Sequence, residues 1–165
     1  MKKAIKKTRI YVLNTGGTLG MVGNPLRAAK SAAELMEGVM VPKDVELTVD
    51  DFKMRQDSTN LLHAERVMIA HQLAANYQNF DAFVVMHGTD SLAETCAAFS
   101  MFFKTSLQKP LIVVGAQMTK DEVGTDVYMQ LSNTFRIADT FHRNNAVGVY
   151  NVCIGDVWDL SLIHI

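Results

Sequence analysis

Two short runs of consecutive apolar residues, AFVVMH at 82–87 and LIVVGA at 111–116, constrain the fold of this chain more than any other feature. Neither run alternates between apolar and polar positions, which is typical of strands that are covered on both faces. Helix-like segments separate these runs from their neighbours along the chain, and parallel strands need such crossover connections. The pattern therefore predicts a single α/β domain with an open, mostly parallel sheet and helices on both faces.

The remaining elements follow from hydrophobic periodicity and from turn residues. Further strands are predicted at 9–14, 45–52 and 146–154. Helices are predicted within 28–40 and over 63–77, 91–104 and 125–143.

The two helices that flank the strand at 82–87 carry more specific signals. Ser91 and Glu94 match a capping box, in which both side chains bond to backbone N–H groups at the start of a helix. The hydroxyl of Ser91 is therefore predicted to cap helix 91–104. Helix 63–77 has a stripe that is predicted to face the core, made of Val67, Ala70, Ala74 and Tyr77.

Each of the first four predicted strands is followed by a polar or glycine-containing cluster. These clusters are TGGT at 15–18, QDST at 56–59, HGTD at 87–90 and GAQ at 115–117. The carboxyl ends of parallel strands lie at one edge of a sheet, and ligands bind in the crevice there. We therefore expect the four clusters to form one pocket.

The chemistry of these clusters favours catalysis over nucleotide binding. The fingerprints GxGxxG and GxxxxGK[ST] are absent, and no lysine or arginine falls within the clusters to meet a phosphate. A threonine hydroxyl becomes a nucleophile when a neighbouring group takes its proton and backbone amides hold the oxyanion. Each motif alone also fits a structural role, with Thr15 and Thr18 closing a turn and Thr89 and Asp90 starting a helix.

Three of these motifs together resemble the signatures of the L-asparaginase family. They are Thr15-Gly16-Gly17-Thr18, Asp57-Ser58, and His87-Gly88-Thr89-Asp90 in the frame VVMHGTDSLAET; PLIVVGAQ resembles the strand and turn that follow in those enzymes. The resemblance runs from about residue 8 to residue 159. It implies a Rossmann- or flavodoxin-like N-terminal domain over residues 1–159, from a cytoplasmic type I enzyme that hydrolyses L-asparagine to L-aspartate and ammonia.

The resemblance also implies a role for each matching residue. Thr18 would attack the side-chain amide carbon and form an acyl-enzyme, while Thr89 and Asp90 would belong to a second catalytic group. The backbone carbonyl of Ala116 would contact the leaving amide. The implied substrate-binding residues are Asp57, Ser58, Thr59, Thr89, Asp90 and Ala116.

The chain departs from the family pattern in two places. The loop after the first motif, residues 19–35, lacks the tyrosine that assists the nucleophile in the family. The family's catalytic lysine and its smaller C-terminal domain are expected to be absent, which predicts a truncated chain with little or no activity. Residues 160–165, LSLIHI, match an in-frame translation of the transposase sequencing adaptor CTG TCT CTT ATA CAC ATC and are predicted to be a non-native tail.

Composition and charge limit the kinds of partner that the chain is expected to bind. A formal net charge of -1 argues against a nucleic-acid partner, and the apolar run that follows the basic N-terminus is too short for a signal peptide or a membrane span. Cys96 and Cys153 are predicted to be buried thiols in a reducing compartment, which favours the cytoplasm. The histidines show no paired ligand pattern, so we expect no metal and no cofactor. The expected partner is a small-molecule substrate, and the resemblance implies a homo-oligomer.

Three alternatives share this sequence pattern. The chain could act on L-glutamine, or it could belong to the amidase subunit of a tRNA-dependent transamidation complex. It could also be a non-catalytic module that binds an amino acid. A nucleotide-binding domain is a more distant alternative.

Overall fold

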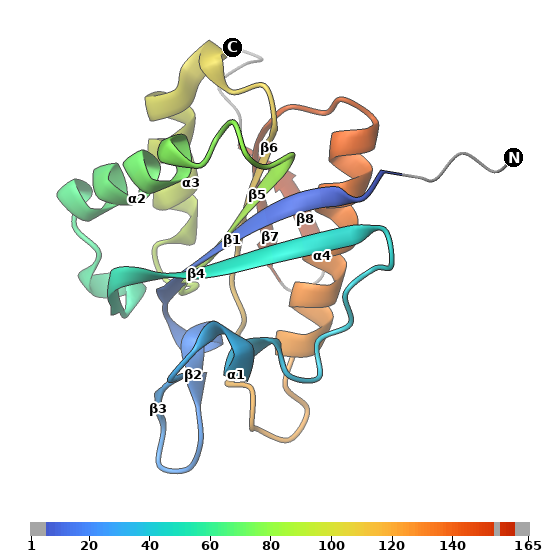
Figure 1. Ribbon diagram of the computed structural model, residues 1–165. Coiled ribbons are helices and arrows are strands. Elements are labelled where there is room, and N and C mark those ends of the chain that lie inside the picture. The colour runs from blue at the N-terminus through green and yellow to red at the C-terminus, as the bar shows by residue number, and fades with distance from the viewer. Residues whose placement is uncertain (1–5, 154–155, 161–165) are drawn as a thin grey trace, which may run out of the picture.

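The computed structural model of the chain describes residues 6–153 and 156–160, in which a six-stranded sheet has the order β4-β1-β5-β6-β7-β8 (Figure 1). The first five strands in this order pair in parallel, and β8 runs antiparallel to β7. The predicted α/β fold with a mostly parallel sheet is therefore confirmed. The strands are β1 (Thr8–Gly16), β4 (Val45–Gln56), β5 (Ala82–Met86), β6 (Pro110–Val114), β7 (Gly148–Cys153) and β8 (Asp156–Asp159).

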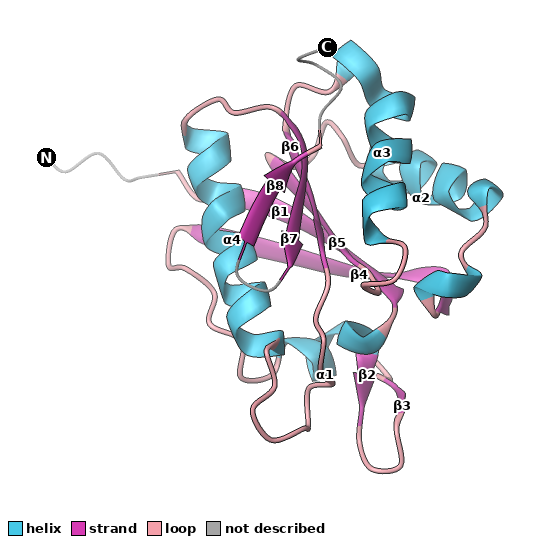
Figure 2. Cartoon of the chain, turned by 180° about the vertical axis from the view of Figure 1, so that it is seen from behind, coloured by secondary structure: helices cyan, strands magenta, loops and turns pink. Residues whose placement is uncertain are grey.

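Helices cover both faces of this sheet, as Figure 2 shows from behind. One core cluster joins α1 (Ala32–Met36) and α4 (Val127–Arg143) to Ile10 and Val12 of β1. The other joins α2 (His63–Ala75) and α3 (Leu92–Phe103) to Tyr11 and Leu13 of the same strand. Both faces of β1 are buried, which explains why its sequence does not alternate with polar residues.

The strand order creates a crevice at the carboxyl edge of the sheet. From β1 the chain first crosses to β4 on one side and then returns to β5 on the other side. At such a switch point the two following segments leave the strand ends in opposite directions, which opens a gap for a ligand. The first, second and third polar clusters of the sequence therefore lie at this gap.

Three short strands were not predicted, because elements of two to four residues leave no periodicity to detect. β2 (Met21–Val22) and β3 (Arg27–Ala28) form a small antiparallel hairpin after β1. β8 adds an antiparallel edge beside β7. Three 3-10 turns complete the described chain: Thr18–Gly20, Ser58–Asn60 and Lys104–Ser106.

Two detailed predictions for the helices were wrong, one of them only in part. In the predicted stripe of helix 63–77, Ala70 is buried and Tyr77 packs against the core, but Ala74 is exposed; the buried side chains of α2 are Ile69, Ala70 and Leu73. Ser91 does not cap α3 with its side chain. Its hydroxyl instead donates a hydrogen bond of 2.7 Å to the carbonyl oxygen of Ser58, a partner distant in sequence.

Leu160, the first residue of the predicted tail, continues the edge of the sheet. Its N–H donates to the carbonyl oxygen of Val149, and its own carbonyl accepts from the hydroxyl of Ser100. The rest of that tail, residues 161–165, and residue 154 of the predicted last strand lie outside the described residues. None of the helices within the described part of the chain is long and apolar enough to span a membrane.

Candidate active site

The structure brings the motifs of the first three strand ends into direct contact. A Cβ atom on Gly17 would lie 3.0 Å from the carbonyl carbon of His87 and closer still to the backbone of Gly88. A Cβ atom on Gly88 would lie 2.8 Å from the Cβ of Ser58. The glycines of TGGT and HGTD thus allow two backbones to touch, with the Asp57-Ser58 turn packed behind them.

The fourth motif joins the same edge. A Cβ atom on Gly115 would lie 2.9 Å from the Cγ2 of Thr89 and 2.9 Å from a methyl group of Leu92. Ala116, the next residue, is fully buried. The four motifs therefore meet at one sheet edge, but the predicted single pocket is formed only in part. Of the predicted site residues, Thr18 and Asp57 line the cavity described below, whereas Ser58, Thr59, Thr89, Asp90 and Ala116 do not.

The two threonines of TGGT have different environments. Thr15 is buried, and its hydroxyl donates a hydrogen bond of 2.7 Å to the carbonyl oxygen of Met86. This bond joins β1 to β5, so Thr15 has the structural role that was one of the alternatives. Thr18 is partly exposed, and its hydroxyl has no hydrogen-bond partner in the part of the chain that the structure describes.

Thr18 borders a cavity of about 310 Å³. The cavity is bounded by the first motif, by the hairpin that follows it and by the end of β4. Its lining residues are Gly16, Gly17, Thr18, Gly20, Met21, Ala28, Arg55, Gln56 and Asp57. The volume suits a small ligand.

The turn after β4 presents both an anion and an unpaired hydroxyl. The backbone N–H and the hydroxyl of Thr59 each donate a 2.9 Å bond to Asp57 Oδ1, and these bonds hold the pKa of Asp57 below its usual range. Asp57 is thus an anion at neutral pH. Ser58 is only 2% exposed, yet its Oγ has no hydrogen-bond partner. A buried hydroxyl without a partner is unfavourable and is a natural position for a ligand group.

The HGTD turn has a buried part and an open part. His87 is fully buried, whereas Thr89 is partly exposed and Asp90 is exposed. Burial lowers the pKa of His87, and the nearby charge of Arg66 acts in the same direction, although the hydrogen bond with the carbonyl of Gly88 opposes both. His87 is therefore neutral at pH 7.

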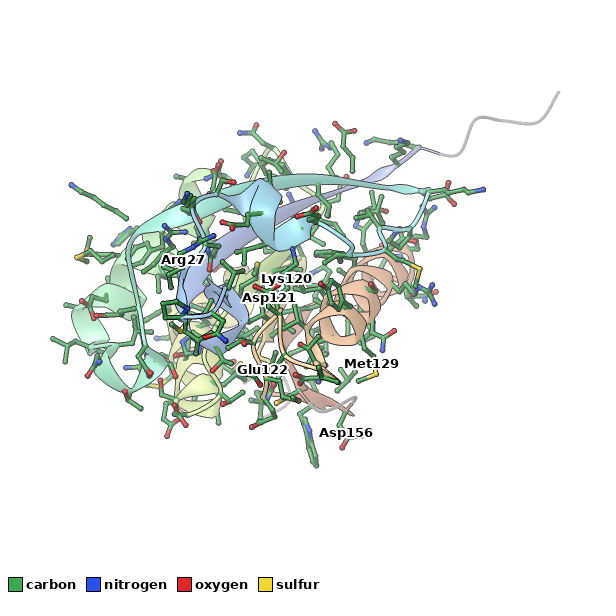
Figure 3. All side chains as sticks on the ribbon, turned by 90° about the horizontal axis from the view of Figure 1, so that it is seen from below. Arg27, Lys120, Asp121, Glu122, Met129 and Asp156 are labelled. Carbon is green, nitrogen blue, oxygen red and sulfur yellow. The ribbon has the colours of Figure 1, made fainter. Side chains whose placement is uncertain are left out.

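The loop after the first motif is held in place by side chains from elsewhere. Arg55 donates to the carbonyl of Ala29 at 3.0 Å, Asp121 accepts from the N–H of Gly23 at 2.5 Å, and Lys120 donates to the carbonyl of Glu34. Figure 3, seen from below, shows Lys120 and Asp121 on the same side of the molecule as Arg27 of the hairpin. The loop contributes Met21 and Ala28 to the cavity wall, and no tyrosine of the described residues lines it.

Arg55 corrects one inference from the sequence. The four clusters contain no lysine or arginine, but β4 runs four residues beyond its predicted end at Phe52 and carries Arg55, which precedes the second cluster, into the cavity wall. Its guanidinium forms an ion pair of 2.9 Å with Asp51, which partly neutralises it. Among residues 6–153 and 156–160, no group of three or more histidine, cysteine, aspartate or glutamate side chains is arranged to hold a metal ion.

Comparison with protein families gives one match that covers most of the chain. The family described as "Asparaginase, N-terminal" matches residues 9–158. L-asparaginase 1 of Escherichia coli K12 is 29% identical over 153 residues, which cover 89% of this chain and 45% of the relative. A subunit of the glutamyl-tRNA(Gln) amidotransferase of Thermococcus kodakarensis is 31% identical over 134 residues, which cover 78% of this chain and 30% of the relative.

Solved structures agree with these matches. The structure of L-asparaginase I from Vibrio cholerae superimposes with a TM-score of 0.81 at 28% identity, covering 93% of this chain and 46% of that protein. The L-asparaginase of Thermococcus kodakarensis gives a TM-score of 0.74 at 25% identity, covering 90% of this chain and 45% of that protein. The chain therefore spans a little less than half the length of the asparaginases that it matches.

Proposed function

Because the chain belongs to the asparaginase family of amidohydrolases, we propose that its strand-end cavity binds L-asparagine and that Thr18 is the nucleophile. The observation that carries this proposal is the difference between the two threonines of the first motif. The hydroxyl of Thr15 is bonded to Met86, whereas the hydroxyl of Thr18 borders the cavity without a partner in the described chain. Of these two threonines, only Thr18 can attack a ligand without breaking a hydrogen bond within the described chain.

In the proposed reaction, Thr18 Oγ1 attacks the carbon of the side-chain amide and loses its proton. The amide nitrogen takes up a proton and leaves as ammonia, so that an ester joins Thr18 to the aspartyl group. Water then hydrolyses the ester to release aspartate and restore the hydroxyl. The backbone N–H groups of Thr18 and Thr89 have no acceptor in the described residues, and we assign them to the developing oxyanion.

The substrate's charged groups are assigned to the other motifs. We assign Asp57 and Asp90 to the α-ammonium group, and the α-carboxylate to the buried Ser58 hydroxyl, which has no other partner in the described chain. Thr59 contributes by holding Asp57 in its ionised form. The carbonyl of Ala116 is assigned to the leaving amide.

We further propose that the 165-residue chain on its own turns over L-asparagine far more slowly than its full-length relatives. Asp57, Thr59 and Asp90 are exposed to solvent, and water weakens each electrostatic contact in such a site. The cytoplasmic location, the homo-oligomer and the non-native tail remain predictions.

The test compares the chain with its Thr18→Ala variant by two measurements of reactivity and by calorimetric titration with L-aspartate. The first is ammonia release from L-asparagine, with Escherichia coli L-asparaginase 1 assayed alongside. The second is the intact mass after incubation with a diazoketone analogue of asparagine, which alkylates an activated nucleophile. We expect slow turnover and a single adduct in the chain, and neither in Thr18→Ala.

The outcomes separate the alternatives. L-aspartate binding of equal affinity in both proteins, without an adduct, would contradict a nucleophilic role and favour a non-catalytic binding module. Turnover near that of the full-length relative would contradict the proposed low activity.

The relationship to the glutamyl-tRNA(Gln) amidotransferase favours a second candidate, an amidase that delivers ammonia to a partner. Ammonia release that is faster from L-glutamine than from L-asparagine, or that requires a partner protein, would favour this candidate.

A further inference from the structure

Arg66 of α2 lies behind the candidate site and connects its motifs. Its Nη1 donates to the carbonyl of Leu61 at 2.8 Å, its Nη2 to the hydroxyl of Ser91 at 3.0 Å, and its Nε to the hydroxyl of Thr95 at 2.9 Å. Arg66 does not line the cavity. It is therefore placed to act on the site only through other groups.

The first path leads from Arg66 through Thr95 to the HGTD turn. His87 Nδ1 lies 2.7 Å from the carbonyl oxygen of Gly88, which can only accept, so Nδ1 carries the proton. In the neutral ring Nε2 then accepts from the hydroxyl of Thr95, 3.0 Å away. Thr95 in turn accepts from Arg66 Nε, so every hydrogen bond in the path points from the guanidinium toward Gly88.

This path fixes the peptide unit that joins Gly88 to Thr89. Because the C=O and N–H of a trans peptide point in opposite directions, a carbonyl held by His87 turns the N–H of Thr89 away from the buried ring. That N–H has no acceptor in the described chain. The path therefore sets the direction of a free donor at the site.

The second path leads from Arg66 through Ser91 to the turn after β4. The hydroxyl of Ser91 accepts from Arg66 and donates to the carbonyl of Ser58 at 2.7 Å. The same peptide unit carries the N–H of Thr59, which bonds to Asp57 Oδ1. The orientation of the Asp57 carboxylate thus depends on a carbonyl that Ser91 holds.

We propose that Arg66 is a positioning residue that orients both backbone segments of the site, through Thr95 and His87 to Gly88 and through Ser91 to Ser58. A single guanidinium can hold two turns at once because its donors form a rigid planar fork. Hydrogen bonds within such a partly buried network reinforce one another. The inference rests on the proposed function, because it assumes that these two turns bind the substrate.

The test measures L-aspartate affinity and stability together in the 165-residue chain. Arg66→Met removes all donors and keeps the length of the side chain. Thr95→Val breaks only the first path with little change in shape. Arg9→Met is the control, since Arg9 is also a partly exposed arginine but pairs with Asp81, next to the N-terminal end of β5, and not with the motifs.

We expect calorimetric titration to show that Arg66→Met weakens L-aspartate binding by about tenfold to a hundredfold, the usual effect of losing charged hydrogen bonds. Thr95→Val is expected to weaken it less, and Arg9→Met not at all. Equal affinity of Arg66→Met and Arg9→Met at similar melting temperatures would overturn the proposal, because the network would then be merely structural.

A second readout is independent of ligand binding. The ¹⁵N shifts of the His87 ring and the amide signal of Thr89 report the first path directly. We expect the Nδ1–H form of His87 in the chain, and a changed ring signal and Thr89 amide in Arg66→Met and Thr95→Val. If the unmodified chain does not bind aspartate, the proposed function fails for this chain. Unchanged His87 and Thr89 signals in both variants would overturn the role of Arg66 separately.

Discussion

Gly88→Ala tests the contact between the HGTD turn and the Asp57-Ser58 turn. The added Cβ would lie 2.8 Å from the Cβ of Ser58 and closer still to its Oγ. Gly88 does not have a positive φ, so alanine brings no backbone strain of its own. The cost of the substitution therefore comes from this contact alone.

The expected size of the effect follows from the packing. Forcing an extra carbon into a filled site costs about 1–3 kcal/mol of the free energy of unfolding. Ser58→Gly removes both clashing side-chain atoms and leaves the Ser58 nitrogen 3.3 Å from the new Cβ, a contact that a small shift can relieve. Because Ser58 Oγ has no partner, Ser58→Gly sacrifices no hydrogen bond and costs about 0.5–1 kcal/mol through added chain entropy.

The assay is urea unfolding of the chain, of both single variants and of the double variant. We expect the double variant to be about as stable as Ser58→Gly, which gives a coupling energy of about 1–3 kcal/mol. Single effects that simply add, within about 0.5 kcal/mol, would show that the two turns do not touch and would refute the convergence of the motifs.

Three further predictions concern the same region. Gly17→Ala should lower the free energy of unfolding by about 2–6 kcal/mol in urea, because Gly17 has a positive φ of 72° and the new Cβ collides with the HGTD turn. Gly124→Ala is the control: its φ is 84° but the space around it is open, so it should cost only the backbone strain of about 1–3 kcal/mol. Equal losses in the two variants would contradict the close approach of the two turns. Ser58→Ala should leave the free energy of unfolding unchanged or raise it by up to about 1 kcal/mol, because it removes a buried hydroxyl that has no partner. Calorimetric titration of the same variant should show weaker L-aspartate binding. A large loss of stability would mean that the hydroxyl has a partner. Arg27 lowers the pKa of Glu34 to about 2, so the stability from this pair is fully present above pH 4.5 and is lost as the pH falls from 4.5 toward 2. Over this range the melting temperature of Glu34→Gln should therefore fall less than that of the unmodified chain. Parallel curves of melting temperature against pH for the two proteins would contradict the prediction.

The fold could be predicted because its strongest signals are local. The buried strands at 82–86 and 110–114 are continuous apolar runs, and such runs leave few arrangements other than a covered parallel sheet. The hairpin of β2 and β3 could not be predicted, since each of its strands has two residues. Contacts with the loop that follows β6 hold this hairpin, and no local pattern reveals them.

The parts of the site that the sequence did not reveal depend on contacts between distant residues. Ser91 has the spacing of a capping box, but Arg66 and the carbonyl of Ser58 compete for its hydroxyl in the folded chain. Only the family resemblance separated Thr18 from Thr15, because the pairing of β1 with β5, which brings Met86 to Thr15, leaves no local signal in the sequence. Arg55 was missed because β4 extends past its predicted end.

The most direct test of the central claim is an NMR titration of the ¹⁵N-labelled chain with L-aspartate. The account predicts that the amide signals of Thr18, Ser58 and Thr89 shift together with one dissociation constant, because these residues surround one binding site. Shifts confined to another surface, such as the groove between α2 and α3 that Val67 and Phe102 line, would contradict it, as would no shift at all.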